Sequence, residues 1–292
     1  HDVEKAYADL HNSAVGAERY AEKMYGRYFG PVNYSFNIGN AHVVTIKSIN
    51  YRGGCHYEEE ITEEDLRWLE RDLSYVPKDR LVILNMHAPG WNAMEPIDNI
   101  LNAKRLEEIL APYDAHVFAG HTHFFENVEV SPRLYQHNIG SACGAWWTSN
   151  ICRDGSPNGY MVVTVDSKKL RWKYRSANSK SDVQMRVYKP GEFRTQKDFI
   201  VANVWEWDPH CRVVWYEDGK YKGLMQRFVD NDEAFLRTKP RKHQLAKTGH
   251  LFRARPSSKK YRYIKVIFIN RFGETFTWKW ENRNNRPFLL DK

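Results

Sequence analysis

Two short apolar runs that each end on histidine constrain the fold of this chain most strongly. Residues 80–86 read Arg-Leu-Val-Ile-Leu-Asn-Met and lead directly into His87. Residues 115–119 read Ala-His-Val-Phe-Ala and lead into Gly120-His121-Thr122-His123. Continuous apolar runs of this length are typical of buried strands, as in parallel sheets. The functional crevice of an open α/β sheet lies outside the carboxyl ends of its strands, so neighbouring strands would bring these histidines to one edge.

The histidine pair after the second run indicates a metal site. In extended backbone, side chains two positions apart point to the same side, so His121 and His123 can face one cavity. Imidazole is the commonest protein ligand for such ions, and Gly120 lets the backbone pass closely. The tetrapeptide alone is a weak signal, because a chain with 12 histidines contains such pairs by chance. The third histidine, His87, ends the other apolar run. It therefore favours a metal site over the alternative that His121 and His123 are merely two polar residues in a loop.

Three blocks of the sequence resemble those of the calcineurin-like metallophosphoesterases, in the order that this family carries them. His1-Asp2 matches the end of the third block, which reads Gly-Asn-His-Asp or Gly-Asn-His-Glu. The strand ending on His87 resembles the fourth block, and Gly120-His121-Thr122-His123 resembles the fifth. The segments 34–46 and 62–73 are similar to the hairpin and helix between these blocks. An ordered succession is more specific than any single motif.

This resemblance implies a hydrolase of phosphorylated small molecules or other phosphoesters that uses two divalent metal ions. It implies that His87 and His121 bind one ion and that His123 binds the other. Zinc, manganese and iron all suit mixed histidine and carboxylate ligands, so the identity of the metal stays open. His1 is implied to stabilise or protonate the leaving oxygen, and Asp2 to orient its imidazole.

Two acidic blocks with which the family begins do not precede His1 here. They read Asp-x-His and Gly-Asp-x-x-Asp and supply the carboxylate that bridges both ions; the Asn before the histidine of the third block is missing too. Three histidines cannot provide about four ligands for each of two ions. Since the chain also opens without Met or signal-like residues, we expect a preceding segment that supplies Asp, His and Asn ligands. We expect these 292 residues alone to be inactive.

The pattern of apolar residues predicts a layered α/β core over residues 1–180. By resemblance, this core is the C-terminal part of the layered metallophosphoesterase α/β sandwich. Helices are expected from Ser13 to Tyr25 and from Glu63 onward with Thr62 as N-cap. Leu101, Asn102 and Leu106 repeat this start signal, with Asn102 in the capping position, for a helix that ends at Pro112. A hairpin is expected to turn at Gly39-Asn40.

A second domain is expected over residues 191–292, after a polar stretch between Ser176 and Gly191. Short strands separated by turns are typical of an all-β sandwich-like domain. The expected strands are Phe199 to Trp207, Arg212 to Tyr216, His250 to Ala254, Tyr263 to Asn270 and Thr275 to Trp280. The pattern is similar to the C-terminal domain of an exported bacterial subgroup of the family, which implies a periplasmic or extracellular location. We expect its many aromatic side chains to fill the core rather than to bind a ligand.

Charge and hydropathy exclude two classes of partner. The formal net charge is +8, and basic residues cluster from Arg237 to Lys265. No nucleic-acid motif accompanies them, so a solvated surface is expected rather than a nucleic-acid site. No run approaches the roughly 18 apolar residues of a membrane-spanning helix.

Several points stay open in the sequence. Cys143 and Cys152 could form a disulfide or remain free thiols. The segment Cys152–Gly159 is rich in turn formers and also resembles a loop near the active site of extracytoplasmic relatives. His210 and His250 lack ligand partners at metal spacing and are expected to be structural. The alternative to the enzyme is a non-catalytic glycan- or protein-binding module with a relic half-site.

Overall fold

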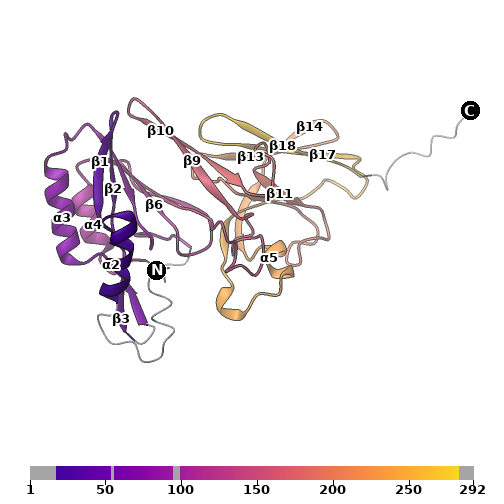
Figure 1. Ribbon diagram of the computed structural model, residues 1–292. Helices are drawn as coiled ribbons and strands as arrows, with labels where there is room; N and C mark the ends of the chain where they lie inside the picture. Colours follow the sequence, from indigo (N-terminus) through magenta and orange to yellow (C-terminus); the bar gives the residue numbers. More distant parts are fainter. Residues whose placement is uncertain (1–17, 54–55, 95–98, 283–292) are drawn as a thin grey trace, which may run out of the picture. The chain divides into compact units, whose positions relative to one another are not determined.

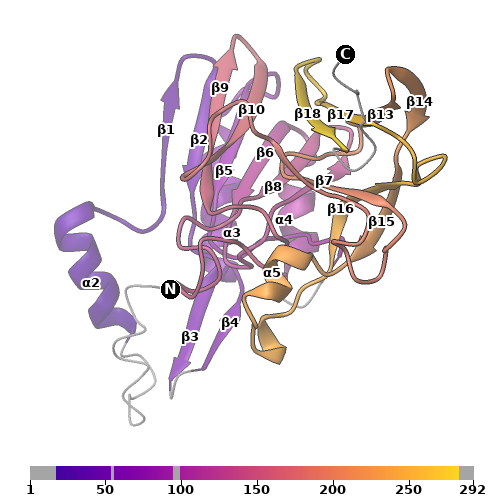
Figure 2. The same ribbon diagram turned by 90° about the vertical axis from the view of Figure 1, so that its right-hand side faces the viewer.

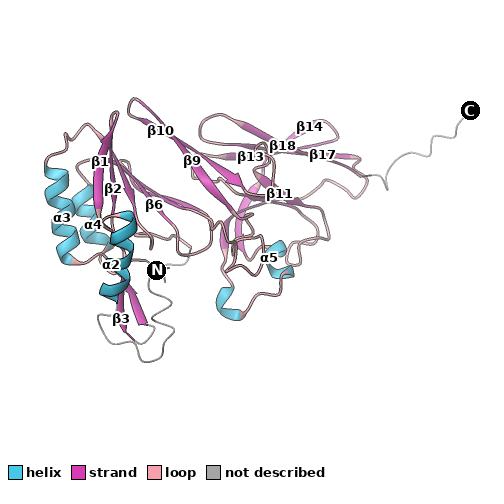
Figure 3. Ribbon diagram, in the orientation of Figure 1, coloured by secondary structure: helices cyan, strands magenta, loops and turns pink. Residues whose placement is uncertain are grey.

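The computed structural model describes residues 18–53, 56–94 and 99–282. Within these ranges the protein is a mixed α/β structure with many strands in several sheets and few helices, which confirms the predicted mixed class (Figures 1 and 3). The candidate catalytic residues His1 and Asp2 lie outside the described residues. The chain divides into two compact units: the first contains residues 1–122, 126–139 and 163–171, and the second contains residues 123–125, 140–162 and 172–292.

A six-stranded sheet of order β1-β2-β5-β6-β8-β7 forms the centre of the first unit. Its inner strands β2, β5, β6 and β8 are parallel, and the edge strands β1 and β7 are antiparallel to their neighbours. The two runs that precede the histidines are β5 and β6, and they pair directly with each other. The strands are β1 (Tyr34–Ile38), β2 (Ala41–Thr45), β5 (Leu81–Asn85), β6 (Asp114–Ala119), β7 (Glu126–Ser131) and β8 (Leu134–Asn138).

Helices α3 (Glu63–Ser74) and α4 (Ala103–Leu110) lie side by side against one face of this sheet (Figure 1). The Oγ1 of Thr62 accepts a hydrogen bond from the backbone N–H of Asp65 at 3.1 Å, as its predicted role as N-cap requires. Leucines at helical spacing in α3 are at most 1% exposed and share a core with the sheet.

The start of α4 differs from the prediction. Asn102 precedes the helix, but its side chain does not cap it. Its Nδ2 donates to the carbonyl of Ile61, and its Oδ1 accepts from the N–H of the same residue at 3.3 Å. An amide side chain offers both a donor and an acceptor, so here it satisfies a neighbouring peptide unit rather than the helix terminus.

The second face of the six-stranded sheet is only partly covered. Phe36, Val43, Ile83 and His116 lie in register across β1, β2, β5 and β6, and they alternate with the residues that pack on α3 and α4. Phe36 is 47% exposed, and the other three side chains are half-buried. Parallel sheets are normally covered on both faces. Among the described residues, this face is therefore covered less completely than the face that packs on α3 and α4.

Five further elements of the described residues lie outside the six-stranded sheet. Helix α2 (Glu18–Phe29) overlaps the predicted helix, whose first residues 13–17 are not described. Strands β3 (Ile49–Gly53) and β4 (His56–Glu59) form a separate hairpin that continues beyond the six-stranded sheet (Figure 2). Strands β9 (Gly159–Asp166) and β10 (Lys169–Ser176) form a second two-stranded sheet.

Two four-stranded antiparallel sheets make up most of the second unit. One hydrophobic core joins them, for example through Ile200 and Phe252 from one sheet and Val213 and Phe268 from the other, so the arrangement is sandwich-like. The sheet order is β11-β12-β16-β15 in one and β14-β13-β17-β18 in the other. The strands are β11 (Met185–Tyr188), β12 (Ile200–Val204), β13 (Arg212–Glu217), β14 (Lys220–Leu224), β15 (Gln226–Asp230), β16 (Thr248–Ala254), β17 (Tyr263–Ile269) and β18 (Thr275–Glu281).

Two short elements, the helix α5 (Glu233–Arg237) and a 3₁₀ turn (Lys242–Gln244), join β15 to β16.

Cys143, Cys152 and Cys211 are free thiols, so the structure shows no Cys143–Cys152 disulfide. No helix within the described ranges is long and apolar enough to span a membrane. The predicted domain ranges 1–180 and 191–292 stay predictions.

Glu206 is a buried carboxyl group in the second unit and is 1% exposed. Its two oxygens accept hydrogen bonds from the N–H of Tyr174 at 2.8 Å and from Nδ2 of Asn270 at 3.0 Å. Burial raises the pKa of Glu206 from 4.5 to about 7, and the two hydrogen bonds only partly oppose this.

Glu206 should make the protein less stable as the pH rises. The folded state keeps its proton up to about pH 7, whereas the unfolded chain releases it near pH 4.5. The free energy of unfolding should therefore fall by up to about 3 kcal/mol between pH 5 and pH 8, as measured by urea unfolding. In Glu206→Gln this part of the pH dependence should vanish, although the amide nitrogen must face a donor and lowers stability at every pH. An identical pH dependence in both proteins would contradict the assignment.

Candidate functional site

The parallel pairing of β5 and β6 brings two of the three predicted metal ligands together. His87 and His121 each lie two residues beyond the end of their strand, at the same edge of the sheet. Nδ1 of His121 is 3.1 Å from Nε2 of His87, and the ring centroids are 5.0 Å apart. The expected convergence at the carboxyl edge is therefore present for this pair.

Glu59 at the end of β4 contacts the same cluster. Its Oε1 lies 3.2 Å from Nε2 of His121, whose side chain is 8% exposed. A carboxylate only accepts, so Nε2 carries the proton, and in the neutral ring Nδ1 accepts from Nε2–H of His87. Tyr57 packs edge-on against the His121 ring, with centroids 5.9 Å apart. A carboxylate and an aromatic edge thus fix the orientation of this imidazole.

The backbone around the histidines is bent rather than extended, so the expectation of extended geometry is wrong here. The φ angles are +69° at His121 and +56° at His123, and both are in the left-handed region. The N–H of Thr122 donates to the carbonyl of Gly120 at 2.8 Å, and Oγ1 of Thr122 accepts from Nδ2 of Asn138 at 2.7 Å. Non-glycine residues adopt such angles rarely, and they concentrate at functional sites.

His123 belongs to the second unit. Its Nδ1 donates to the carbonyl of Gly144 at 2.7 Å, because a carbonyl can only accept. In the neutral ring the lone pair therefore lies on Nε2. Histidines that bind metals usually donate their other N–H to a carbonyl or carboxylate in this way. The ring also stacks on Trp146, with centroids 4.6 Å apart and planes inclined by 15°.

These donors fit part of a metal site. Within the described ranges, no group of three or more His, Cys, Asp or Glu side chains is arranged to hold a metal ion. His87 and His121 have the right donor atoms in proximity, but a hydrogen bond joins them. To bind an ion through Nδ1 of His121, this hydrogen bond must be replaced. The position of His1 and Asp2 lies outside the described residues.

A cavity of about 390 Å³ adjoins His87 in the first unit. Oγ of Ser48 shapes its wall by accepting from the N–H of His87 at 3.0 Å and from that of Ala88 at 2.8 Å. Lys47 pairs with Glu22 at this cavity. The volume suits a small organic phosphoester, and the lysine adds a cation to its lining.

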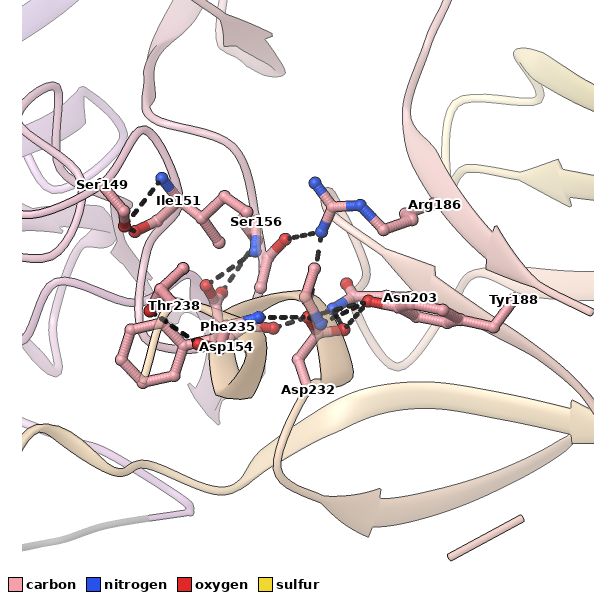
Figure 4. Close-up of polar contacts among 12 residues, drawn as sticks. Ser149, Ile151, Asp154, Ser156, Arg186, Tyr188, Asn203, Asp232, Phe235 and Thr238 are labelled. Carbon is pink, nitrogen blue, oxygen red and sulfur yellow. Dashed lines mark hydrogen bonds and ion pairs between the residues drawn. The ribbon is translucent and has the colours of Figure 1, made fainter. Parts of the chain in front are cut away.

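The loop 152–159 is anchored by Asp154, which is 1% exposed (Figure 4). Its Oδ2 accepts from the N–H of Phe125 at 2.7 Å, from Oγ of Ser156 at 2.8 Å and from Nε2 of His250 at 3.0 Å. Burial alone raises the pKa of Asp154, but its hydrogen bonds, above all the one from His250, lower the pKa below its usual value. His250 therefore lies in a buried hydrogen-bond network, with a carboxylate partner that is 96 residues away in the sequence.

The same loop is tied to the sandwich through Asp232 (Figure 4). Nδ2 of Asn203 donates both to the carbonyl of Asp154 and to Oδ2 of Asp232, each at 2.8 Å. Asp232 also caps α5 and accepts from the hydroxyl of Tyr188. Gly155 has φ +82°, and a Cβ there would lie 2.0 Å from Cγ of Asp232. Only glycine fits this close approach.

The loop also holds the segment that carries His123. The N–H of Arg153 donates to the carbonyl of His123 at 2.9 Å, next to the bond between Phe125 and Asp154. The loop 152–159 is therefore both a structural turn and a neighbour of a candidate ligand.

The sequence did not identify Glu59 as part of the site. Glu59 lies in a run of three glutamates, and such a run is typical of the solvated edge of a strand.

Replacing Asp154 should destabilise the second unit. In Asp154→Asn the amide must face at least one buried donor, and the charge that attracts His250 is lost. We expect the free energy of unfolding to fall by about 3 kcal/mol in urea titrations. Asp198→Asn is the matched control, because Asp198 is 66% exposed and pairs only at the surface with Arg255, so its effect should stay within about 0.5 kcal/mol. Equal losses of unfolding free energy in both variants would contradict this. They would show that the buried hydrogen bonds of Asp154 stabilise the unit no more than the surface ion pair of Asp198 does.

Comparison with known proteins adds one finding. Residues 136–276 match the family model described as the C terminal of calcineurin-like phosphoesterase. The matched region begins within β8 and ends within β18, so it includes the loop 152–159 and most of the sandwich. No curated protein matches the chain. The resemblance predicted from the sequence is confirmed over this region, and residues 136–276 are similar to the C-terminal region of calcineurin-like phosphoesterases.

Proposed function

We propose that the parent protein is a metal-dependent phosphoester hydrolase and that this chain carries part of its two-metal site. The observation that carries the proposal is the meeting of His87 and His121 at the carboxyl edge of two adjacent parallel strands. The family match supports a phosphoesterase. Members of that family generally use divalent metals, which supports the metal-dependent mechanism. The cavity beside His87 offers space for a small phosphorylated substrate.

Each side chain has a role in this proposal. His87 and His121 hold one ion and His123 the other, while Glu59 and the Gly144 carbonyl keep two of the rings oriented. When bound, a pair of divalent ions supplies Lewis-acid polarisation of the phosphoryl group and a water that loses its proton near neutral pH.

Two further groups, which lie outside the described residues, would act on the leaving group. His1 protonates or stabilises the leaving oxygen, and Asp2 orients and charge-stabilises that imidazole. Zinc, manganese and iron all remain suitable metals for this donor set.

The partly covered face of the six-stranded sheet supports a further element of the proposal. The apolar row from Phe36 to Ile83 is only partly buried, although parallel sheets usually have cover on both faces. A segment that supplies the Asp, His and Asn ligands would cover this face and complete the layered metallophosphoesterase α/β sandwich. By resemblance to exported relatives, we place the parent protein in the periplasm or outside the cell.

Activity of the parent protein, with that N-terminal segment attached, tests the proposal. Hydrolysis of an aryl phosphoester should stop on chelation and return with added zinc, manganese or iron. His121→Ala should lower kcat/KM by at least about 100-fold, because it removes a ligand. His243→Ala, at an exposed position of the second unit, should leave it unchanged. Full activity after chelation or in His121→Ala would refute the proposal. A parent protein that hydrolyses no phosphoester with any of these metals would favour the glycan- or protein-binding module.

Glu59 should tune metal binding without being a ligand. Glu59→Gln weakens the acceptor at Nε2 of His121, so the dissociation constant of the metal should rise about tenfold in a chelator competition titration of the parent protein. Glu58→Gln is the control, because Glu58 lies next in the same strand and pairs with Arg52 instead. If both variants bind metal like the wild type, Glu59 does not support the site.

A further inference from the structure

Two adjacent tryptophans in the loop that follows β8 are unusually exposed. Trp146 is 40% exposed and Trp147 is 86% exposed. Among large apolar side chains in the described part of the chain, Trp147 is the most exposed. Tryptophan is normally buried over most of its surface, so packing does not account for its presence at this position.

The backbone at both positions is strained. The φ angles are +51° at Trp146 and +60° at Trp147, whereas bulky residues rarely enter the left-handed region. Local hydrogen bonds hold the turn, including Trp147 N–H to the Cys143 carbonyl at 3.1 Å and Thr148 N–H to the Ala145 carbonyl at 3.0 Å. The turn is therefore ordered, and it keeps two large side chains in an unfavourable conformation without burying the second one.

Trp146 connects this turn to a candidate metal ligand. Its ring stacks on His123, and the guanidinium carbon of Arg153 lies 5.5 Å from its centroid. Arg153 is itself fixed by hydrogen bonds to the carbonyls of Gln244 at 3.0 Å and Leu245 at 3.3 Å. Trp146 is thus held in place by its neighbours, while the exposed indole follows it directly in the chain.

We propose that Trp147 is an aromatic platform that stacks on a planar aromatic group of the substrate. This inference rests on the proposed function, because it places the organic part of the phosphoester beside His123. Flat rings gain most from offset stacking on an indole, and such stacking tolerates different aryl or nucleobase groups. The platform therefore selects phosphoesters with an aromatic organic group over those with a flexible aliphatic one.

Hydrolysis by the parent protein tests the selectivity. Trp147→Ala should lower kcat/KM for phenyl phosphate about tenfold and change that for glycerol phosphate less than twofold. Tyr221→Ala is the control, since Tyr221 is 60% exposed on β14 of the same unit and should affect neither substrate. Loss of both activities to the same extent, or of neither, would overturn the platform.

A binding measurement separates this inference from the proposed function. Saturation-transfer NMR on the 292-residue chain should show contact with adenosine monophosphate that Trp147→Ala removes and Tyr221→Ala keeps. Trp147→Gly should also lose the contact without a lower midpoint of thermal unfolding, because glycine relieves the strained φ.

The outcomes are distinct. Contact that depends on Trp147 in a parent protein that hydrolyses no phosphoester would support the platform and refute the hydrolase. Hydrolysis and nucleotide contact that are both independent of Trp147 would support the hydrolase and refute the platform.

Discussion

A backbone hydrogen bond between Gly120 and His87 joins the ends of β5 and β6, where two histidines far apart in the sequence come into contact. The N–H of Gly120 donates to the carbonyl of His87 at 3.0 Å and so extends the pairing of β5 and β6 beyond the ends of both strands. The register of β5 and β6 thus brings the ends of both strands, and the imidazoles that follow them, to the same part of the sheet edge. The contact between the two rings and the candidate metal role of the pair depend on this pairing.

A second network organises the other unit around a different candidate ligand. Asp154 receives hydrogen bonds from His250 in β16 and from Phe125, two residues after His123. Buried carboxylates are stable only when their oxygens are well paired, and here four donors meet this requirement. Because the sandwich provides His250 and Asn203, its residues help to fix the segment that carries His123. This gives the sandwich a role beyond stability, within the unit that contains it.

Much of the fold could be predicted because its signals are local. The apolar runs identify β5 and β6, Thr62 identifies the start of α3, and Gly39-Asn40 identifies the turn between β1 and β2. The features that were missed depend on tertiary contacts. Asn102 pairs with a distant peptide unit instead of capping α4, and nothing in the sequence distinguishes Glu59 from the neighbouring glutamates. The left-handed backbone at His121 could not be predicted either. Glycine commonly adopts positive φ angles and so indicates them in a sequence, whereas histidine does not.

Zinc-loaded crystals of the parent protein, with anomalous diffraction recorded at the zinc edge, would show whether His87 and His121 bind a metal ion. We expect an anomalous peak about 2.0 to 2.1 Å from a ring nitrogen of both His87 and His121. The present 3.1 Å hydrogen bond between the two rings would then be replaced by metal coordination. Rings that still contact each other, with no peak beside either, would contradict it.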